Sequence, residues 1–197
     1  MFEESPVNTK VIECGSAMTK AGYAGQKLPA YYEPTIYAHK GPFAFIGNEA
    51  TEKRAKLNQI FPIQQGIIAK FEIIEMIWAR CFGELRGSDD CIVSMLDVVD
   101  GPAKWRKSMI ESMMETFEVQ GFHLSNCAEN ALYSSGRTTG VVVDSGEGVT
   151  HVTPIFDSKC LMNSVKKIPF GGRNLTNSLE ALLKTNEINI DNTGQID

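Results

Sequence analysis

The pattern of hydrophobic and polar positions separates short apolar runs, typical of strands, from longer amphipathic stretches, typical of helices. In residues 104–117 the apolar positions form one stripe, which predicts a buried helix face made of Met109, Ile110, Met113, Met114 and Phe117. The predicted helices are 48–57, with Asn48 as the cap, 71–85, 104–117, 126–134 and 175–184. The predicted strands are 11–12, 35–38, 43–47, 92–96, 122–124, 141–143 and 164–168, and the segments 1–10, 26–34 and 185–197 are predicted to be irregular.

One stretch, residues 140–151, combines a strand with candidate chemistry. Three consecutive valines at 141–143 run into Asp-Ser-Gly-Glu-Gly, and a second extended run follows. A continuous valine run is typical of a strand that is buried on both faces. The two glycines permit a tight turn whose backbone N–H groups approach a ligand, and Asp144 adds a carboxylate. Such a set suits a phosphate with its divalent cation, although an ordinary hairpin with an acidic turn explains the same residues.

A second version of this arrangement lies near the start of the chain, in residues 11–25. An apolar strand is followed by Glu13, a turn of small residues, and a second strand that carries Lys20. The chain therefore carries the same arrangement of strand, acid and turn twice.

Four motifs closely resemble those of actins and actin-related proteins: AGYAG at 21–25, YSSGRTTG at 133–140, DSGEGVTH at 144–151 and GGRNLT at 171–176. The resemblance extends from about Val11 to Lys184. It implies the α/β, ribonuclease H-like fold of the actin and Hsp70 ATPases, in which two domains face each other across a cleft. We expect residues 1–133 to be a nearly complete first domain and residues 134–197 to begin a second one. The loop that docks onto a neighbouring subunit in actin filaments is shortened here, near residues 39–43.

The resemblance also implies roles for individual residues toward ATP or ADP with Mg²⁺. Acids at the strand ends, Glu13 and Asp144, would hold the metal through water. His151 matches a family residue that positions the attacking water, and Tyr133 borders the cleft to which partners of actins dock. The phosphate-binding candidates are Ser16, Ala17, Met18, Lys20, Gly146, Glu147, Gly148 and Val149.

Three positions depart from the family pattern. Glu13 stands where actins have aspartate, and its extra methylene pushes the carboxylate into a packed site. Ala17 replaces a glycine, which is tolerable only if its φ angle is negative. Cys127 replaces the glutamine that orients the attacking water, and a thiol cannot supply the donor and acceptor of an amide. No part of the chain after Lys184 resembles the adenosine site, so we expect nucleotide to bind weakly.

Composition narrows the class of protein. The formal net charge of −5 does not favour nucleic acid as a partner, and no apolar run reaches membrane-spanning length. Five cysteines without paired spacing indicate reduced thiols and no metal cluster. The N-terminus lacks the basic and apolar regions of a signal peptide. We therefore expect a protein of the cytoplasm and cytoskeleton.

Three functions fit these observations. The first is a non-catalytic structural subunit of a larger cytoskeletal assembly, held by contacts with other chains. The second is an actin-related protein that binds ATP as a structural or slowly hydrolysed ligand. The third is a regulatory module that binds partners around Tyr133. In each case the apolar strands 141–143 and 165–168 should lack cover, so that either a permanent partner covers them or the chain is trimmed to its ordered part.

Overall fold

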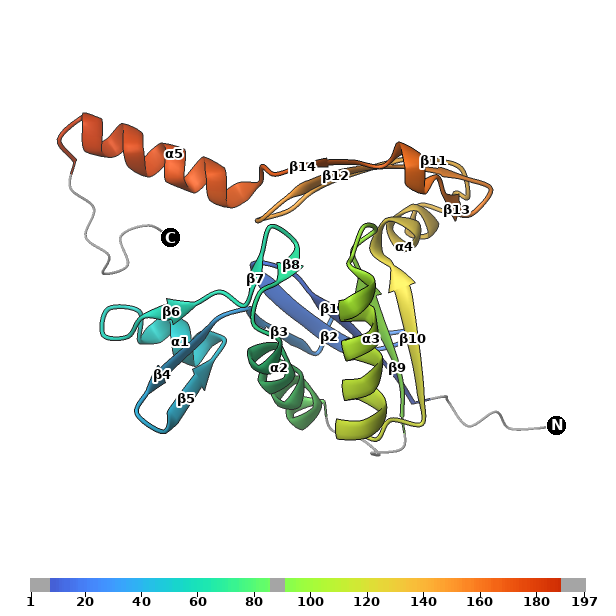
Figure 1. Cartoon of the computed structure of the whole chain (residues 1–197), viewed down its shortest axis with the longest axis horizontal. Coiled ribbons are helices and arrows are strands. Elements are labelled where there is room, and N and C mark those ends of the chain that lie inside the picture. Colours follow the sequence, from blue (N-terminus) through green and yellow to red (C-terminus); the bar gives the residue numbers. More distant parts are fainter. Residues whose placement is uncertain (1–7, 86–90, 189–197) are drawn as a thin grey trace.

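The computed structural model describes residues 8–85 and 91–188, and its first lobe is built on a five-stranded sheet (Figure 1). The strand order is β10-β9-β1-β2-β3, with β9 parallel to both of its neighbours and the remaining pairs antiparallel. The strands are β1 (Thr9–Cys14), β2 (Met18–Tyr23), β3 (Tyr31–Pro34), β9 (Ile92–Asp97) and β10 (Gly121–Asn126). Strand β3 lies in the segment 26–34 that we predicted as a loop, so that part of the prediction is wrong.

Two helices, α2 (Phe71–Glu84) and α3 (Ala103–Glu111), lie side by side on one face of this sheet (Figure 1). Helix α3 continues as a π-helical turn, Ser112–Thr116, and the predicted span of 104–117 is therefore confirmed. The predicted buried stripe is only partly correct. Met109 and Met113 are buried in the core, whereas Ile110 is 46% exposed and Met114 is 44% exposed, because only the side of the helix that faces the sheet is covered.

A small three-stranded sheet extends from the first lobe, in the order β5-β4-β6. Lys40 pairs with Phe43, so only Gly41 and Pro42 join β4 to β5, which confirms that the chain passes directly from strand to strand here. The predicted strand 35–38 is shifted, and the predicted helix 48–57 ends early. Gly47 is its cap instead of Asn48, and no side chain caps it. The elements are β4 (Tyr37–Lys40), β5 (Phe43–Ile46), α1 (Asn48–Glu52) and β6 (Gln59–Ile60).

A short hairpin, β7 (Ile63–Gln64) and β8 (Ile67–Ile68), precedes α2. Its turn residues Gln65 and Gly66 have φ angles of 52° and 73°. Positive φ at both positions is the requirement of a type I′ hairpin turn.

Helix α4 (Cys127–Ser134) carries the chain to the second lobe. Its N-terminus is capped because the Asn126 side chain accepts hydrogen bonds from Ala128 N and Glu129 N. At its other end Gly136 follows the C-cap with a φ angle of 72°, as the sequence predicts.

The second lobe consists of a four-stranded sheet and one long helix. Strand β12 is central, with β11 on one side and both β13 and β14 on the other. Helix α5 begins and ends close to the predicted bounds and projects past the end of the sheet (Figure 1). The elements are β11 (Gly140–Ser145), β12 (Thr150–Phe156), β13 (Lys159–Cys160), the 3₁₀ turn Met162–Ser164, β14 (Lys166–Ile168) and α5 (Gly172–Thr185).

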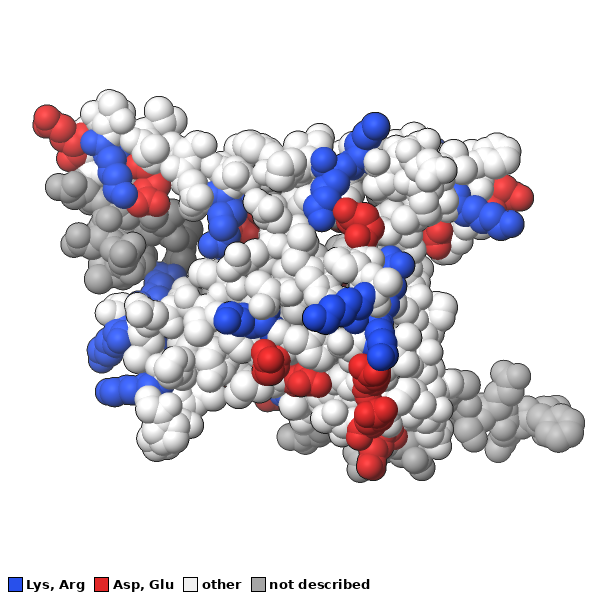
Figure 2. Space-filling view, in the orientation of Figure 1, with Lys and Arg blue, Asp and Glu red and all other residues white. Residues whose placement is uncertain are grey.

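One face of this second sheet has no cover among the described residues. Val142 packs against the small core around α4, but Val141 is 62% exposed and Val143 is 65% exposed. The prediction that the valine run is buried on both faces is therefore wrong. The prediction that the apolar strands 141–143 and 165–168 lack cover is confirmed for Val141, Val143 and Ile168, whereas Val142 and Val165 pack against the small core. Figure 2 shows uncharged residues over much of the band that α5 and this sheet occupy.

Candidate functional site

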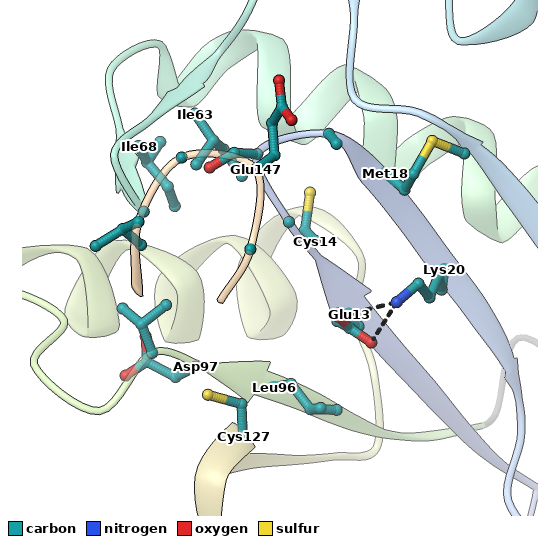
Figure 3. Close-up of a pocket in the computed structure, with 18 of the residues that line it drawn as sticks. Glu13, Cys14, Met18, Lys20, Ile63, Ile68, Leu96, Asp97, Cys127 and Glu147 are labelled. Carbon is teal, nitrogen blue, oxygen red and sulfur yellow. Dashed lines mark hydrogen bonds and ion pairs between the residues drawn. The ribbon is translucent and has the colours of Figure 1, made fainter. Parts of the chain in front are cut away.

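A cavity of about 330 Å³ lies between the two lobes, where β1 and β9 end and the β11–β12 turn approaches (Figure 3). The structure brings together on its wall the phosphate-binding, metal-binding and water-positioning candidates of the sequence analysis. Tyr133 lies elsewhere: it is 43% exposed, and its hydroxyl donates to Ser158 O. The predicted residues that line the cavity are Glu13, Ser16, Ala17, Met18, Lys20, Cys127, Asp144, Gly146, Glu147, Gly148, Val149 and His151.

The turn between β1 and β2 is tight. Gly15 N donates to Met18 O at 3.0 Å, which closes the turn. Ala17 is not among the described residues with positive φ, so its Cβ is accommodated without backbone strain. The sequence left open whether alanine is tolerated at position 17. The structure shows that it is, because the φ angle of Ala17 is not positive.

Lys20 pairs with the acid directly opposite it on β1. Its Nζ lies 3.3 Å from both carboxylate oxygens of Glu13 (Figure 3). The two side chains are 41% and 45% exposed, so water screens the pair and it contributes little to stability. The cation that would face a phosphate is therefore balanced by a carboxylate within its own hairpin.

The β11–β12 turn reaches across to the first lobe and touches two other hairpins. A Cβ on Gly148 would lie 2.7 Å from Ser16 Oγ and 3.1 Å from Gln65 N, which leaves no room for any side chain. Glycine is thus required here by close approach, and its φ angle is not the reason. The third hairpin, β7–β8, was missed as part of the site, although Gly66 within a two-residue turn between Ile63-Gln64 and Ile67-Ile68 was an available hairpin signal.

Cys127 lies at the start of α4 among several carboxylates. Burial, followed by the negative charges of Asp144, Asp97 and Glu13, raises the pKa of its thiol to about 11. The thiol therefore stays protonated near neutral pH. It also lacks the acceptor strength needed to orient a water molecule.

His151 is 4% exposed, and its Nε2 lies 2.9 Å from Asp100 Oδ1. The other carboxylate oxygen of Asp100 lies 3.2 Å from Lys167 Nζ. Partial burial opposes ionisation of Asp100, but the contacts with Lys167 and His151 outweigh it and lower the pKa of this carboxyl below its ordinary value of 3.8. One of the two ring nitrogens of His151, Nε2, is thus bound to a carboxylate.

A comparison with protein families assigns the fold. The family model described as Actin matches residues 4–197, which is nearly the whole chain. The chain belongs to the actin family. Its mixed α/β architecture, with two sheets facing a shared cavity, is an actin-like fold.

Sequence motifs of the actin family did not reveal a buried acid in this site. Asp97, at the carboxyl end of β9, lines the cavity, is 8% exposed and pairs with Arg106 Nε. Gly101 lies so close that a Cβ there would be 2.6 Å from Asp97 Oδ1. An acid at the end of a parallel strand was the available signal, since active sites of α/β proteins gather at that edge.

The GGRNLT motif packs against the β11–β12 turn. Arg173 Nη2 lies 3.0 Å from Glu147 Oε1, and its guanidinium lies 4.1 Å from the centre of the Phe61 ring in the first lobe. A Cβ on Gly171 would lie 2.5 Å from Gly146 O, which explains a glycine at that position. Glu147 is thus occupied by Arg173 and contributes no free charge to the cavity.

The described residues contain neither a cluster of metal ligands nor a membrane-spanning helix. Within residues 8–85 and 91–188, no group of three or more metal-binding side chains could hold an ion. In the same residues, no helix has the length and apolarity needed to cross a bilayer. Asp144 lines the cavity and has no ion-pair partner in that part of the chain.

Proposed function

We propose that this actin-family protein is a structural subunit of a larger cytoskeletal assembly in the cytoplasm. It is held there by contacts with other protein chains and does not hydrolyse ATP. The observation that carries the proposal is that a thiol replaces one group of the water-positioning pair and that the other group, His151, has one ring nitrogen bound to a carboxylate. Position 127 holds a protonated thiol, and the Nε2 of His151 is bound to Asp100. Activation of water requires groups within hydrogen-bond reach that are free to bind it.

The second lobe supplies the surface for such contacts. Helix α5 has no buried residue, and Leu175, Leu179 and Leu182 are 60%, 50% and 62% exposed. Together with Val141 and Val143 they add to the apolar surface of this lobe. Exposed apolar patches of this kind mark surfaces that another protein segment covers.

The test is to purify the protein from its native source without added nucleotide. Mass spectrometry identifies partner chains, and denaturation of a portion releases any bound ATP or ADP. We expect stoichiometric partners and no phosphate release above the background rate. Turnover that disappears in the Asp144→Asn variant would overturn the proposal, since that loss would place the activity in this cavity.

Restoring the missing amide makes the test sharper. The Cys127→Gln variant should remain without turnover, because His151 is still bound to Asp100. Phosphate release by Cys127→Gln alone would show that the thiol was the only defect and that the protein is close to an ATPase.

A second candidate function is binding of ATP or ADP as a structural ligand. It is favoured by Asp144, which has no ion-pair partner among the described residues, and by Lys20, whose pair with Glu13 is exposed enough to open. These two residues and the two turns would hold the phosphates and the metal, and the bound nucleotide would supply negative charge that Lys20 neutralises.

Intrinsic fluorescence distinguishes the two candidates. The chain has two tryptophans, and both line the cavity: Trp78 and Trp105. Saturable quenching by Mg-ATP that is weakened at least about tenfold in Lys20→Gln would favour the nucleotide-binding function. The matched control is Lys184→Gln, whose lysine lies on α5 and pairs with Glu180. An unchanged signal in the wild-type protein favours the structural subunit.

A further inference from the structure

A single carboxylate in the first lobe binds two neighbouring strands of the second. Asp100 lies in the loop between β9 and α3, and its two oxygens contact His151 Nε2 on β12 and Lys167 Nζ on β14. His151 and Lys167 are directly opposite each other in the antiparallel pair β12–β14. The carboxylate therefore meets a cross-strand pair and fixes both strands to the loop.

The surroundings make these contacts stronger than ordinary surface ion pairs. The side chains of His151, Lys167 and Asp100 are 5%, 29% and 33% exposed. Partly buried pairs are screened less by salt than exposed ones. The lowered pKa of the Asp100 carboxyl keeps it ionised under all neutral and mildly acidic conditions.

We infer that Asp100 is an interlobe clasp, which holds the cleft closed through His151 and Lys167 without a nucleotide between the lobes. The inference rests on the proposed function in one respect, because a subunit without bound nucleotide needs another connection across its cleft. The clasp also fixes the orientation of the His151 ring, with Nε2 directed at Asp100.

The rest of the interface is consistent with this role. The β11–β12 turn already touches Ser16 and Gln65, and Arg173 lies over Phe61. Those contacts are short-range packing, which favours closure only once the lobes have met. The clasp adds charge-assisted hydrogen bonds. They join the loop after β9 in the first lobe to two strands of the second lobe that lie far along the sequence.

Hydrogen–deuterium exchange on the protein tests the clasp. The amides to follow are Gly146 N, which donates to Val149 O, and Gly172 N, which donates to Gly146 O, because both hydrogen bonds involve the β11–β12 turn, which touches the first lobe. We expect Asp100→Asn and Lys167→Met each to speed exchange in this segment about tenfold, as loss of a partly buried pair allows. The protection of β1 and β9 should stay unchanged, which shows that the first lobe remains folded.

The matched control is Glu111→Gln. Glu111 pairs with Lys107 four residues earlier on α3, so this variant makes the same carboxylate-to-amide change without crossing the cleft. Exchange rates in Asp100→Asn and Lys167→Met equal to those of the control would overturn the clasp. Additive effects of the two substitutions on the exchange rate of the double variant would also overturn it, since the partners of one ion pair must be energetically coupled. If Asp100→Asn fails to fold, Lys167→Met alone decides.

Addition of Mg-ATP to the wild-type protein separates the two proposals. Slower exchange of the same amides with nucleotide would count against the nucleotide-independent subunit. It would leave the clasp to be judged by the variants alone, because the variants are compared without nucleotide.

Discussion

The two lobes of this molecule use similar hairpins but differ in how completely their sheets are covered. In the first lobe Ile77 and Trp78 of α2 are 0% and 1% exposed against the five-stranded sheet. In the second lobe Val143 is 65% exposed, and α5 has no buried residue. The first lobe is stabilised by its own core, whereas the second depends on α4, on contacts across the cleft and on whatever meets its apolar face. One lobe of this chain thus has a packed core of its own, and the other presents an apolar face that the described residues leave exposed.

One side-chain truncation in each lobe measures this difference directly. Ile77→Ala should lower the free energy of unfolding by about 2–5 kcal/mol, because it leaves a cavity in a packed core. Val143→Ala should change it by no more than about 0.5 kcal/mol, because the side chain is exposed. Urea unfolding followed by circular dichroism gives both values. A comparable loss from Val143→Ala would mean that the valine face is covered in solution.

Cys127 lies at the junction of the lobes, and its reactivity reports whether the cleft is closed. With a pKa of about 11 against an ordinary value of 9.0, its thiolate fraction at pH 7 is about a hundredfold lower than that of a free thiol. We expect alkylation by iodoacetamide to be slower by about that factor than in the denatured chain, and to rise with pH toward 11. Peptide mass spectrometry gives the rate for each cysteine. Fast labelling at neutral pH would show that the thiol is no longer buried beside these carboxylates.

The clasp makes the stability of the closed form depend on pH. The pKa of Asp100 is lower in the folded protein than its ordinary value of 3.8. Its stabilising contribution is therefore fully present above about pH 4 and is lost as the pH falls through the folded-state value. After allowance for solvent screening, wild type should exceed Asp100→Asn by about 0.5–1 kcal/mol at pH 6. Urea unfolding at pH 6 and pH 3 checks the sign, and a difference that grows on acidification would contradict it.

The smallest expected effect on stability concerns the leucines of α5. Replacing Leu175, Leu179 and Leu182 together by glutamine should change the unfolding free energy by less than about 0.5 kcal/mol, since none of them is buried. The same variant should bind much less of an apolar dye and should fail to co-purify with partner chains. Asn177→Gln, on an exposed position of the same helix, is the control. Undiminished recovery of partners would place the assembly surface elsewhere.

Much of this fold is visible in local patterns. Helical spacing predicted the end of α2 to within one residue, and Gly136 marked the end of α4. Both signals are readable because helical periodicity and a left-handed backbone conformation depend on only a few adjacent residues. The end of α1 was not predictable in this way. Charged residues at 52–56 suit a helix, but the chain leaves the helix to place β6 against β4.

The sequence by itself determined two of the turns that line the cleft, since a turn of small residues with an adjacent acid marks where backbone and carboxylates meet, but it did not reveal Asp97 or the β7–β8 hairpin. Only the tertiary structure decided how those residues are used. Asp100 and His151 are 51 positions apart, and no local pattern pairs them. The exposure of Val141 and Val143 was likewise set by what packs on the sheet, because a strand's own sequence fixes the alternation of its side chains but not whether another layer covers them.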